Sequence, residues 1–399
     1  MPSIADLLRT TVERGASDLH LSAGSPPQIR IRGSLVPLDF PPLAPADTQG
    51  MCYSVIMDSQ KKKFEETREL DFSFNQKDVS RFRANLYLDK GAIAGAFRVI
   101  PHEIPSMDTL GLPMPVKDII KAPRGLVLVT GPTGSGKTTS LAAMIDAINM
   151  TRNDHIITVE DPIEYVFTHK NCLVNQREIG QDTESFSTAL KHVLREDPDI
   201  VLIGEIRDRE TMEAALTISE TGHLTLGTLH TSSAVQTIGR VIDIFPPEEQ
   251  PEVRSSLSLT LLAVMSQTLI PRMDAPGRVL AAELMLPNPA IRNLIRENKV
   301  HQIYSQLQLG QEKFGMQTLN QALASLVNRR IISEEEAYGR TSDPDELKQT
   351  IMSGLTSKVG MLGASGQGPE MEGGAMHGGF GLSSAADSSK STLKGVKKG

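Results

Sequence analysis

A glycine-rich loop constrains the fold of this 399-residue chain more than any other feature. Residues 131–138 read GPTGSGKT, which fits the pattern G-x-x-x-x-G-K-[ST]. The apolar run LVLVT precedes the loop, and the helical segment SLAAMIDAI follows it. A loop between a strand and a helix can turn its backbone N–H groups and the helix N-terminus towards phosphates. The sequence therefore predicts a wound α/β domain that binds a nucleotide.

The chemistry of the loop predicts ATP as the nucleotide and magnesium as its companion ion. We expect Lys137 to reach the outer phosphates and Thr138 to offer its hydroxyl to magnesium. The predicted nucleotide contacts are Pro132, Thr133, Gly134, Ser135, Gly136, Lys137, Thr138 and Thr139.

The segment around and after this loop has the pattern of a parallel sheet. Buried apolar runs alternate with helical segments, as in sheets that are covered on both faces. The further runs are HIITVED, DIVLIGE and HLTLGTLH. Residues 251 to about 337 are expected to be mostly helical.

The first hundred residues have a different pattern. An amphipathic helix at the start is followed from Leu19 to about Ile100 by short strands of alternating character, with a helical stretch near 48–57. This pattern predicts an α+β domain with a largely antiparallel sheet. Four prolines in residues 101–115 indicate a linker, and the Gly- and Ser-rich residues from 357 onward are expected to be disordered.

Composition excludes several classes of protein. A net charge of −7 and a pI of about 5.8 argue against a protein that coats nucleic acid by charge. Cys52 and Cys172 are far apart, which excludes a disulfide framework and fits a reducing cytosol. No apolar run approaches the roughly 18 residues of a spanning helix, so we expect membrane association only through partners.

Two predicted strands end in carboxylates, where ligands collect in open α/β sheets. Glu205 ends DIVLIGE and is predicted to be the general base, unless it merely pairs with Arg207. Glu160, Asp161 and Glu164 follow the strand HIITV, and magnesium would relieve their mutual repulsion. Their spacing does not decide which of the three faces the metal.

Histidines and arginines supply further candidates. His223 and His230 bracket one apolar strand, and His230 could bond the terminal phosphate, although a strand-end histidine is often only capped by backbone. Arg81 and Arg83 are two residues apart and so share a face of their strand. They either aid solubility or approach a phosphate across a domain or subunit boundary.

With these motifs in place, the sequence closely resembles the PilT family, the retraction ATPases of type IV pili, from its start to about residue 345. The segments that carry the resemblance are GASDLHLSAG at 15–24, RFRAN at 81–85, GPTGSGKTT at 131–139, TVEDPIEY at 158–165, CLVNQREIG at 172–180, REDPDIVLIGEIRD at 195–208 and ETGHLTLGTLHTSSA at 220–234.

The resemblance implies a role for each candidate. Glu164 is implied as a catalytic residue of an acidic box and as a magnesium ligand, and Glu205 ends an atypical Walker B strand. His223 and His230 are implied as a histidine box, and Arg83 as a contact to ATP.

The resemblance also extends to residues 290–297, AIRNLIRE, a segment associated with retraction. By spacing, this is a helix with Ile291, Leu294 and Ile295 on one side. Its more exposed members are expected to be Arg292, Arg296 and Glu297. The residues implied in coupling are Ala290, Ile291, Arg292, Asn293, Leu294, Ile295, Arg296 and Glu297.

The family implies an assembly as well as a fold. The expected assembly is a cytoplasmic homohexamer with ATP between subunits and domains, docked on an inner-membrane platform protein. The expected fold is α/β, a RecA-like ATPase domain preceded by a smaller α+β PAS-like domain. The expected boundaries are 1–100 for the PAS-like domain, 101–115 for the linker, 116–356 for the RecA-like domain with its helical C-terminal part and 357–399 for the tail.

Four alternatives stay open. The first is that the chain is an accessory retraction paralogue; such a paralogue could also be a partner of the chain. The second is that it is a pilus extension or type II secretion ATPase. The latter usually has four zinc-binding cysteines, whereas this chain has two cysteines in all. A motor that pulls nucleic acid is disfavoured by acidic charge and few aromatic residues. A scaffold that binds ATP without hydrolysis is disfavoured by intact Lys137 and Glu205.

Overall fold

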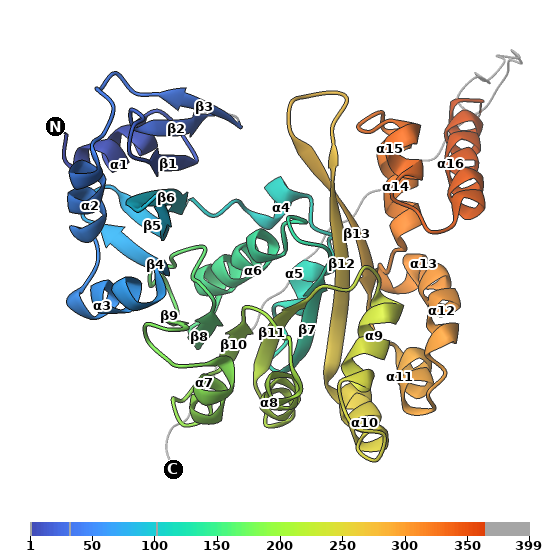
Figure 1. Ribbon diagram of the computed structural model, residues 1–399. Coiled ribbons are helices and arrows are strands. Elements are labelled where there is room, and N and C mark those ends of the chain that lie inside the picture. The colour runs from blue at the N-terminus through green and yellow to red at the C-terminus, as the bar shows by residue number, and fades with distance from the viewer. Residues whose placement is uncertain (1, 32, 101–102, 364–399) are drawn as a thin grey trace, which may run out of the picture. The chain divides into compact units, whose positions relative to one another are not determined.

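The computed structural model describes residues 2–31, 33–100 and 103–363, and within these it contains two β-sheets (Figure 1). Residues 1–354 form one compact unit that holds both sheets, and residues 355–399 form a second unit. Across the described residues, no helix is both long and apolar enough to cross a bilayer.

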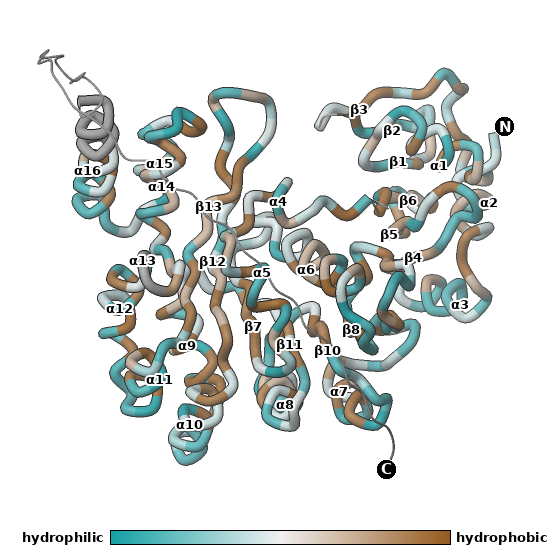
Figure 2. Tube along the Cα trace, turned by 180° about the vertical axis from the view of Figure 1, so that it is seen from behind, coloured by the Kyte–Doolittle hydropathy of each residue, from teal (hydrophilic) through white to brown (hydrophobic). Residues whose placement is uncertain are grey.

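The N-terminal sheet is antiparallel, as the alternating pattern predicts. Its strand order is β3-β2-β1-β6-β5-β4. The strands are β1 (Asp18–Leu21), β2 (Gln28–Ile31), β3 (Ser34–Pro37), β4 (Glu69–Gln76), β5 (Ser80–Asp89) and β6 (Ala92–Ile100). The accompanying helices are α1 (Ile4–Glu13), α2 (Pro45–Tyr53) and α3 (Asp58–Thr67). The hydrophilic α3 was not predicted, and Phe64 is its buried residue (Figure 2).

Strand β5 separates its two faces by alternation. Phe82, Ala84 and Leu86 are completely buried in the core of the sheet. Arg81 and Arg83 lie on the opposite face, because successive strand residues point to opposite sides. The alternation thereby places both arginines outside the N-terminal core.

A short connecting segment leads from β6 to the second sheet. It contains two single-turn helices, α4 (Met107–Leu110) and α5 (Val116–Ile119). Ser106 caps α4 by accepting a hydrogen bond from the N–H of Thr109, and Gly111 ends it in the left-handed conformation. The proline-rich segment therefore has more local order than its composition predicts.

The second sheet has the strand order β13-β12-β7-β11-β10-β8-β9. All neighbours pair in parallel except β12 and β13. The central strands are among the most hydrophobic segments in Figure 2, which fits burial on both faces. The strands are β7 (Gly125–Thr130), β8 (His155–Glu160), β9 (Leu173–Glu178), β10 (Ile200–Ile203), β11 (Leu224–Leu229), β12 (Leu261–Pro271) and β13 (Arg278–Met285).

Helices connect these strands as the sequence predicts. Two separate hydrophobic cores form against the sheet, and each contains residues of β7. The helices are α6 (Lys137–Thr151), α7 (Phe186–Val193), α8 (Arg209–Glu220), α9 (Ala234–Asp243) and α10 (Gln250–Thr260). Parallel strands with crossover helices bring the strands' carboxyl ends to one edge, where ligands bind.

The mostly helical interpretation of residues 251–337 is wrong for the hairpin of β12 and β13. The run LLAVMSQTLI is apolar enough for a buried helix, and periodicity alone does not separate the two. Pairing decides in favour of a strand, because β12 adds to the open edge of β7 and β13 then pairs with β12. Gly277 ends the connecting turn with a φ of 116°.

Helices follow the hairpin to the end of the described residues. A fourth core cluster joins residues of β12 and β13 to α14, α15 and α16. The expected start of the tail, residue 357, lies within α16, and residues 364–399 are outside the described part of the chain. The helices are α11 (Pro289–Arg296), the 3-10 helix η1 (Val300–Gln302), α12 (Ile303–Leu309), α13 (Gln311–Phe314), α14 (Leu319–Asn328), α15 (Glu334–Tyr338) and α16 (Pro344–Gly363).

Candidate nucleotide-binding site

A cavity of about 570 Å³ lies at the carboxyl ends of the parallel strands. It combines the phosphate loop with carboxylates, a histidine and arginines. Its lining residues are Arg83, Thr133, Gly134, Gly136, Lys137, Thr138, Thr139, Glu160, Asp161, Pro162, Glu164, Phe186, Gly204, Glu205, Arg207, Thr228, His230, Leu269 and Arg278. Most of the candidates that the sequence predicts as separate motifs thus meet in one cavity.

The phosphate loop joins β7 directly to α6. Gly136 has a φ of 87° where α6 begins, a conformation that favours glycine. The N-terminus of α6, with its unpaired backbone N–H groups, is suited to an anion. Pro132 is exposed and Ser135 is buried, and neither lines the cavity.

Lys137 folds back onto its own loop in this structure. Its Nζ donates to the carbonyl oxygens of Gly131 at 2.9 Å and Pro132 at 3.1 Å. Burial lowers the pKa of Lys137, while the nearby carboxylates of Glu205 and Glu164 oppose that shift. A flexible side chain that already lines the cavity can exchange these carbonyls for phosphate oxygens.

The two threonines after Lys137 have different surroundings. Thr138 lines the main cavity and a smaller adjoining one. The hydroxyl of Thr139 lies 3.1 Å from that of Tyr165, which follows the acidic segment. Thr138 is therefore the more available of the two for a metal ion.

Glu205 is held between two partners. Arg207 donates two hydrogen bonds to its carboxylate, at 2.6 and 2.7 Å, and Nε2 of His230 lies 3.0 Å from Oε1. The hydrogen bond from Arg207 lowers the pKa of Glu205 below its usual value. Because the Arg207 side chain is 70% exposed, the pair is solvated and easily exchanged. The pairing weighed at the sequence level is present, and Glu205 nevertheless lines the cavity.

The three carboxylates of the acidic segment are not equivalent. Glu160 is buried and accepts hydrogen bonds from the Thr158 hydroxyl at 2.6 Å and from the Gln176 amide at 3.1 Å. Burial raises the pKa of Glu160 to about 7. Asp161 and Glu164 are exposed and line the cavity. Two of the three carboxylates are therefore free to approach a cation without leaving internal partners.

The two histidines lie at opposite ends of β11. His230 follows the carboxyl end of the strand and contacts Glu205 within the cavity. His223 precedes the amino end, where Nδ1 lies 3.1 Å from the carbonyl oxygen of Ile218. The cavity of one chain does not include His223, so the predicted contact of His223 with the nucleotide has no support from this geometry.

The two arginines of β5 have separate surroundings. Arg83 is exposed and lines the cavity. Arg81 donates a hydrogen bond of 2.7 Å to Glu178, the last residue of β9. The side chain of Arg81 is 15% exposed. Arg81 therefore joins the two sheets, whereas Arg83 is available to a bound phosphate.

Sequence reasoning missed Arg278 as a candidate. It is the first residue of β13 and lines the same cavity. Nothing pointed to it, because the hairpin was interpreted as helical. The signal that could have found it is a turn at Gly277 followed by a run of strand-forming residues, which predicts that Arg278 begins a strand.

Helix α11, residues 289–296, lies outside the cavity. Ile291 and Ile295 are completely buried, and Leu294 is half-buried against the same core. Arg292, expected among the more exposed residues, is half-buried and donates to two backbone carbonyls in the last turn of α10 and to that of the first residue of β12. Arg296 and Glu297 are exposed as predicted.

Comparisons with known proteins agree with this geometry. Residues 106–339 match the family described as type II/IV secretion system protein. The type IV pilus retraction ATPase PilT of Pseudomonas aeruginosa is 52% identical over 342 residues, which span 86% of this chain and 99% of that protein. This chain belongs to the PilT family of secretion ATPases. The type IV pilus ATPase PilU of the same organism is 39% identical to this PilT-family chain, covering 92% of it and 96% of PilU.

A solved structure extends the family likeness to three dimensions. The crystal structure of the pilus retraction motor PilT with bound ADP matches this PilT-family chain with a TM-score of 0.83 and 51% identity. The match covers 88% of this chain and all of that one. The α/β fold with a parallel sheet is therefore confirmed, and nucleotide binding is a property of a relative of the same fold.

Proposed function

We propose that this PilT-family ATPase hydrolyses ATP to power type IV pilus retraction, in which pilin is depolymerised and the cell twitches. The observation that carries the proposal is the meeting of Lys137, Glu164 and Glu205 in one cavity at the phosphate loop. The sequence identity with a curated retraction ATPase, over nearly the whole of that protein, supports retraction rather than extension of the pilus.

The residues present fit a magnesium ion, which prefers oxygen ligands and usually keeps several waters. We propose that the Thr138 hydroxyl and the Glu164 carboxylate hold it, because both line the cavity. When bound, magnesium neutralises charge on the phosphates. Asp161 is the alternative ligand, whereas Glu160 is already bonded to Thr158 and Gln176.

Hydrolysis requires Glu205 to accept a proton from the attacking water. Its lowered pKa keeps the carboxylate charged at neutral pH, as a general base must be before it acts. In this role it exchanges Arg207 for the water, while His230, whose Nε2 lies 3.0 Å from Oε1, helps to orient the carboxylate. Arg83, from the N-terminal sheet, and Lys137, from the phosphate loop, both line the cavity and supply positive charge to the phosphates.

We further propose a homohexamer at the cytoplasmic face of the inner membrane, docked on the pilus platform protein. Arg83 comes from the N-terminal sheet and the phosphate loop from the second sheet, so a site of this composition responds to movement between domains or subunits. We propose a division into a domain of residues 1–100, a linker of residues 101–115, an ATPase domain of residues 116–356 and a tail of residues 357–399. No nucleic acid is expected as a partner.

The catalytic assignment predicts distinct defects in two variants. Lys137→Ala is expected to lose ATP binding or hydrolysis, because the phosphates lose their main cation. Glu205→Ala is expected to bind ATP yet turn over about 10² to 10⁴ times more slowly, the usual loss of a general base. Nucleotide binding and steady-state phosphate release on the purified full chain measure both effects.

Glu213→Ala provides the matched control, because Glu213 is exposed on the outer part of α8 and does not line the cavity. It is expected to bind and hydrolyse ATP normally. Normal turnover in Glu205→Ala would refute the general-base assignment.

Retraction itself is tested in cells. Deletion of the gene is expected to leave long pili that extend but never shorten when single labelled pili are observed. The relationship to PilU favours a second candidate, an accessory retraction ATPase. In that case deletion slows or weakens shortening without abolishing it, and a second retraction ATPase is a partner.

A further inference from the structure

Strand β12 lies directly beside the phosphate-loop strand β7 (Figure 1). The two strands pair in parallel, with Ser266 opposite Thr130 at the last position before the loop. The hydroxyls of these two residues are 2.7 Å apart and buried. The end of β7 is therefore fixed sideways to β12 by a side-chain bond as well as by the backbone ladder.

The next residue of β12, Gln267, reaches the phosphate loop itself. Its Nε2 donates to the carbonyl oxygen of Ser135 at 2.7 Å, and the residue is 3% exposed. The backbone also approaches closely, because a Cβ built on Gly131 would lie 2.3 Å from the carbonyl oxygen of Gln267. No side chain fits at Gly131 between the loop and β12, so the two backbones are in direct contact there.

This contact is only half satisfied. Within the described chain, Oε1 of Gln267 and Oγ of Ser135 are buried without a hydrogen-bond partner. Buried polar atoms without partners are costly and uncommon. Gln267 thus makes one hydrogen bond to the loop through Nε2 and keeps a second buried polar atom, Oε1, beside it.

The other end of β12 is held by helix α11. Strand β12 begins at Leu261, immediately after α10 ends at Thr260. The guanidinium of Arg292 donates to the carbonyl oxygens of Ser258 and Leu259 through Nη1, and to that of Leu261 through Nη2. Arg292 thus caps the carboxyl end of α10 and joins α11 to the first residue of β12.

We propose that β12 is the connection through which the phosphate loop and α11 influence one another. Gln267 is the positioning residue at the loop end, and Arg292 is the positioning residue at the α11 end. Neither is a catalytic residue, because each acts through backbone carbonyls of neighbouring segments. The inference rests on the proposed function, since it explains how a nucleotide-dependent change in the loop reaches the helix implied in retraction.

Thermodynamic reciprocity makes the connection testable from either end. If the nucleotide state biases α11 through β12, then a change that loosens the contact of α11 with β12 must in turn alter nucleotide affinity. Arg292 does not line the nucleotide cavity, so a merely structural cap has no reason to change ADP affinity.

The decisive experiment measures ADP binding to the full chain by fluorescence titration with a labelled ADP. Arg292→Leu is expected to change the dissociation constant about fivefold or more, within the usual range of allosteric coupling. Arg292→Lys keeps the charge but not the fork of the guanidinium, so it is expected to give a smaller change in the same direction.

Arg296→Leu is the matched control, because Arg296 is an exposed basic residue of the same helix and, within the described chain, caps no carbonyl. It is expected to leave ADP affinity within about twofold of wild type, below the usual range of allosteric coupling. Thermal unfolding without nucleotide identifies variants that fail to fold. If Arg292→Leu does not fold, Arg292→Lys still tests the inference.

The loop end is tested with Gln267→Met, which keeps the side-chain volume but removes the amide. ADP binding is expected to weaken roughly five- to tenfold, about the effect of losing one buried hydrogen bond. Combined with Arg292→Lys, the effects on ADP affinity are expected to be non-additive, because both act through one strand.

Strict additivity, or unchanged ADP affinity in both Arg292 variants, would overturn the inference. An equal effect of Arg296→Leu would also overturn it. A wild-type chain that neither binds ADP nor hydrolyses ATP would instead refute the proposed function, so the two failures are distinguishable.

Discussion

Three buried carboxylates show how single residues of this chain are satisfied by different partners. Glu178 is paired with Arg81, and Glu160 is bonded by Thr158 and Gln176. Glu283, on β13, accepts from the backbone N–H of Ala234 at 2.6 Å, and burial raises its pKa. Ala234 begins α9 only four residues after His230, so this carboxylate also helps to position the segment that follows the histidine.

The raised pKa of Glu283 predicts a pH-dependent stability. Its carboxyl keeps a proton in the folded chain above the ordinary value of 4.5, where the unfolded chain has lost it. Stability is therefore greatest below about that pH and falls as pH rises through the raised pKa. The loss is about 1.4 kcal/mol for each pH unit that separates the unfolded from the folded pKa. Glu346 also faces this group, and its negative charge raises the pKa of Glu283 further.

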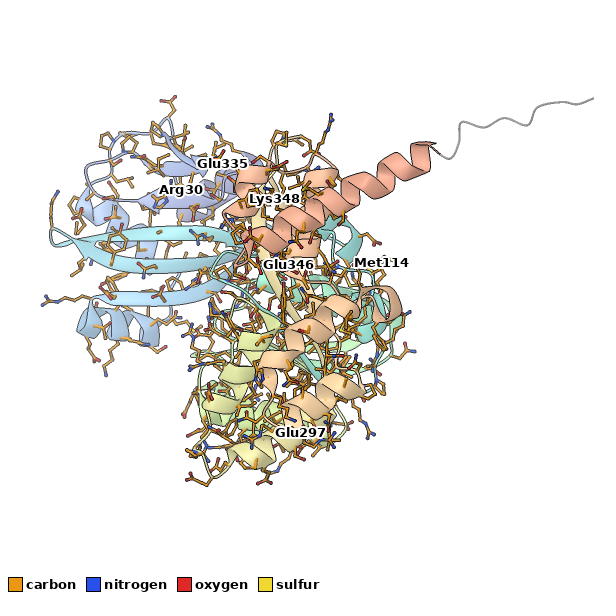
Figure 3. The ribbon with its side chains drawn as sticks, turned by 90° about the vertical axis from the view of Figure 1, so that its right-hand side faces the viewer. Arg30, Met114, Glu297, Glu335, Glu346 and Lys348 are labelled. Carbon is orange, nitrogen blue, oxygen red and sulfur yellow. The ribbon has the colours of Figure 1, made fainter. Side chains whose placement is uncertain are left out.

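Urea unfolding of the wild type and Glu283→Gln between about pH 4.5 and about pH 8 checks this prediction, because the range begins at the ordinary pKa of glutamate. The amide variant cannot ionise, so the difference in unfolding free energy between the two chains is expected to move in its favour as pH rises. Glu346, at the start of α16 (Figure 3), lies beside Tyr304, whose pKa is raised by burial, so both groups are kept unchanged in the comparison. Parallel pH profiles would contradict the prediction.

At the scale of secondary-structure elements, α11 combines a buried and a half-buried face. Ile295 is completely buried in the core that contains β7 residues, whereas Leu294 only packs against the edge of that core. Glu297 marks the exposed end of the helix (Figure 3). The two apolar residues, which share a side by spacing, are therefore unequal probes of coupling.

Leu294→Ala is expected to leave ATP hydrolysis largely intact while abolishing pilus retraction, since its side chain is outside the nucleotide cavity. Ile295→Ala is instead expected to lose about 2–5 kcal/mol of stability, because truncation leaves a cavity in a packed core. Phosphate release, denaturant unfolding and imaging of labelled pili separate the two effects. Equal loss of hydrolysis and retraction in Leu294→Ala would indicate misfolding rather than uncoupling.

Element types were predictable where the pattern had one physical meaning. The runs around Val127, Val159 and Leu202 could be assigned as parallel strands because helical segments separate them. The hairpin of β12 and β13 could not, since an apolar run such as LLAVMSQTLI fits either a buried helix or a strand. The pairing of β12 with β7 depends on tertiary structure. For this reason the sequence did not predict that Gln267 and Arg278 lie near the phosphate loop.

At the scale of the whole molecule, Glu178 connects the two sheets. It accepts hydrogen bonds from the Ser73 hydroxyl at 2.6 Å and from Arg81 at 2.7 Å, both in the N-terminal sheet. It also accepts from the N–H of Ile163 at 3.1 Å, the residue before Glu164. The same carboxylate thus contacts the N-terminal sheet and the segment that carries the predicted catalytic glutamate.

Glu178→Ala is expected to destabilise the chain by about 3–5 kcal/mol, because it leaves the mostly buried guanidinium of Arg81 without its carboxylate partner. Glu196→Ala is the control, since it breaks the more exposed ion pair of Arg177 on the same strand and is expected to cost at most about 1 kcal/mol. Denaturant unfolding of both variants compares them. Equal losses would show that Glu178 contributes no more than a surface pair.

The cavity was predictable as a set of motifs but not as an arrangement. Lys137, Glu205 and His230 follow strands whose parallel order brings their ends together, which the sequence pattern implies. The pairing of Arg81 with Glu178 depends on a contact between segments far apart in the chain. Local periodicity contains no information about such contacts.

Strand β7, which leads into the phosphate loop, has different neighbours on its two sides. On one side lie β11, β10 and β8, whose ends bear His230, Glu205 and Glu160. On the other side lie β12 and β13, which continue into the helices that follow the hairpin. Under the proposed function, the residues assigned to hydrolysis lie mainly on the first flank and the helix implied in retraction on the second, from which Arg278 also reaches the cavity. Substitutions in the helices beyond β13 would then alter mechanical output without replacing any side chain that lines the nucleotide cavity.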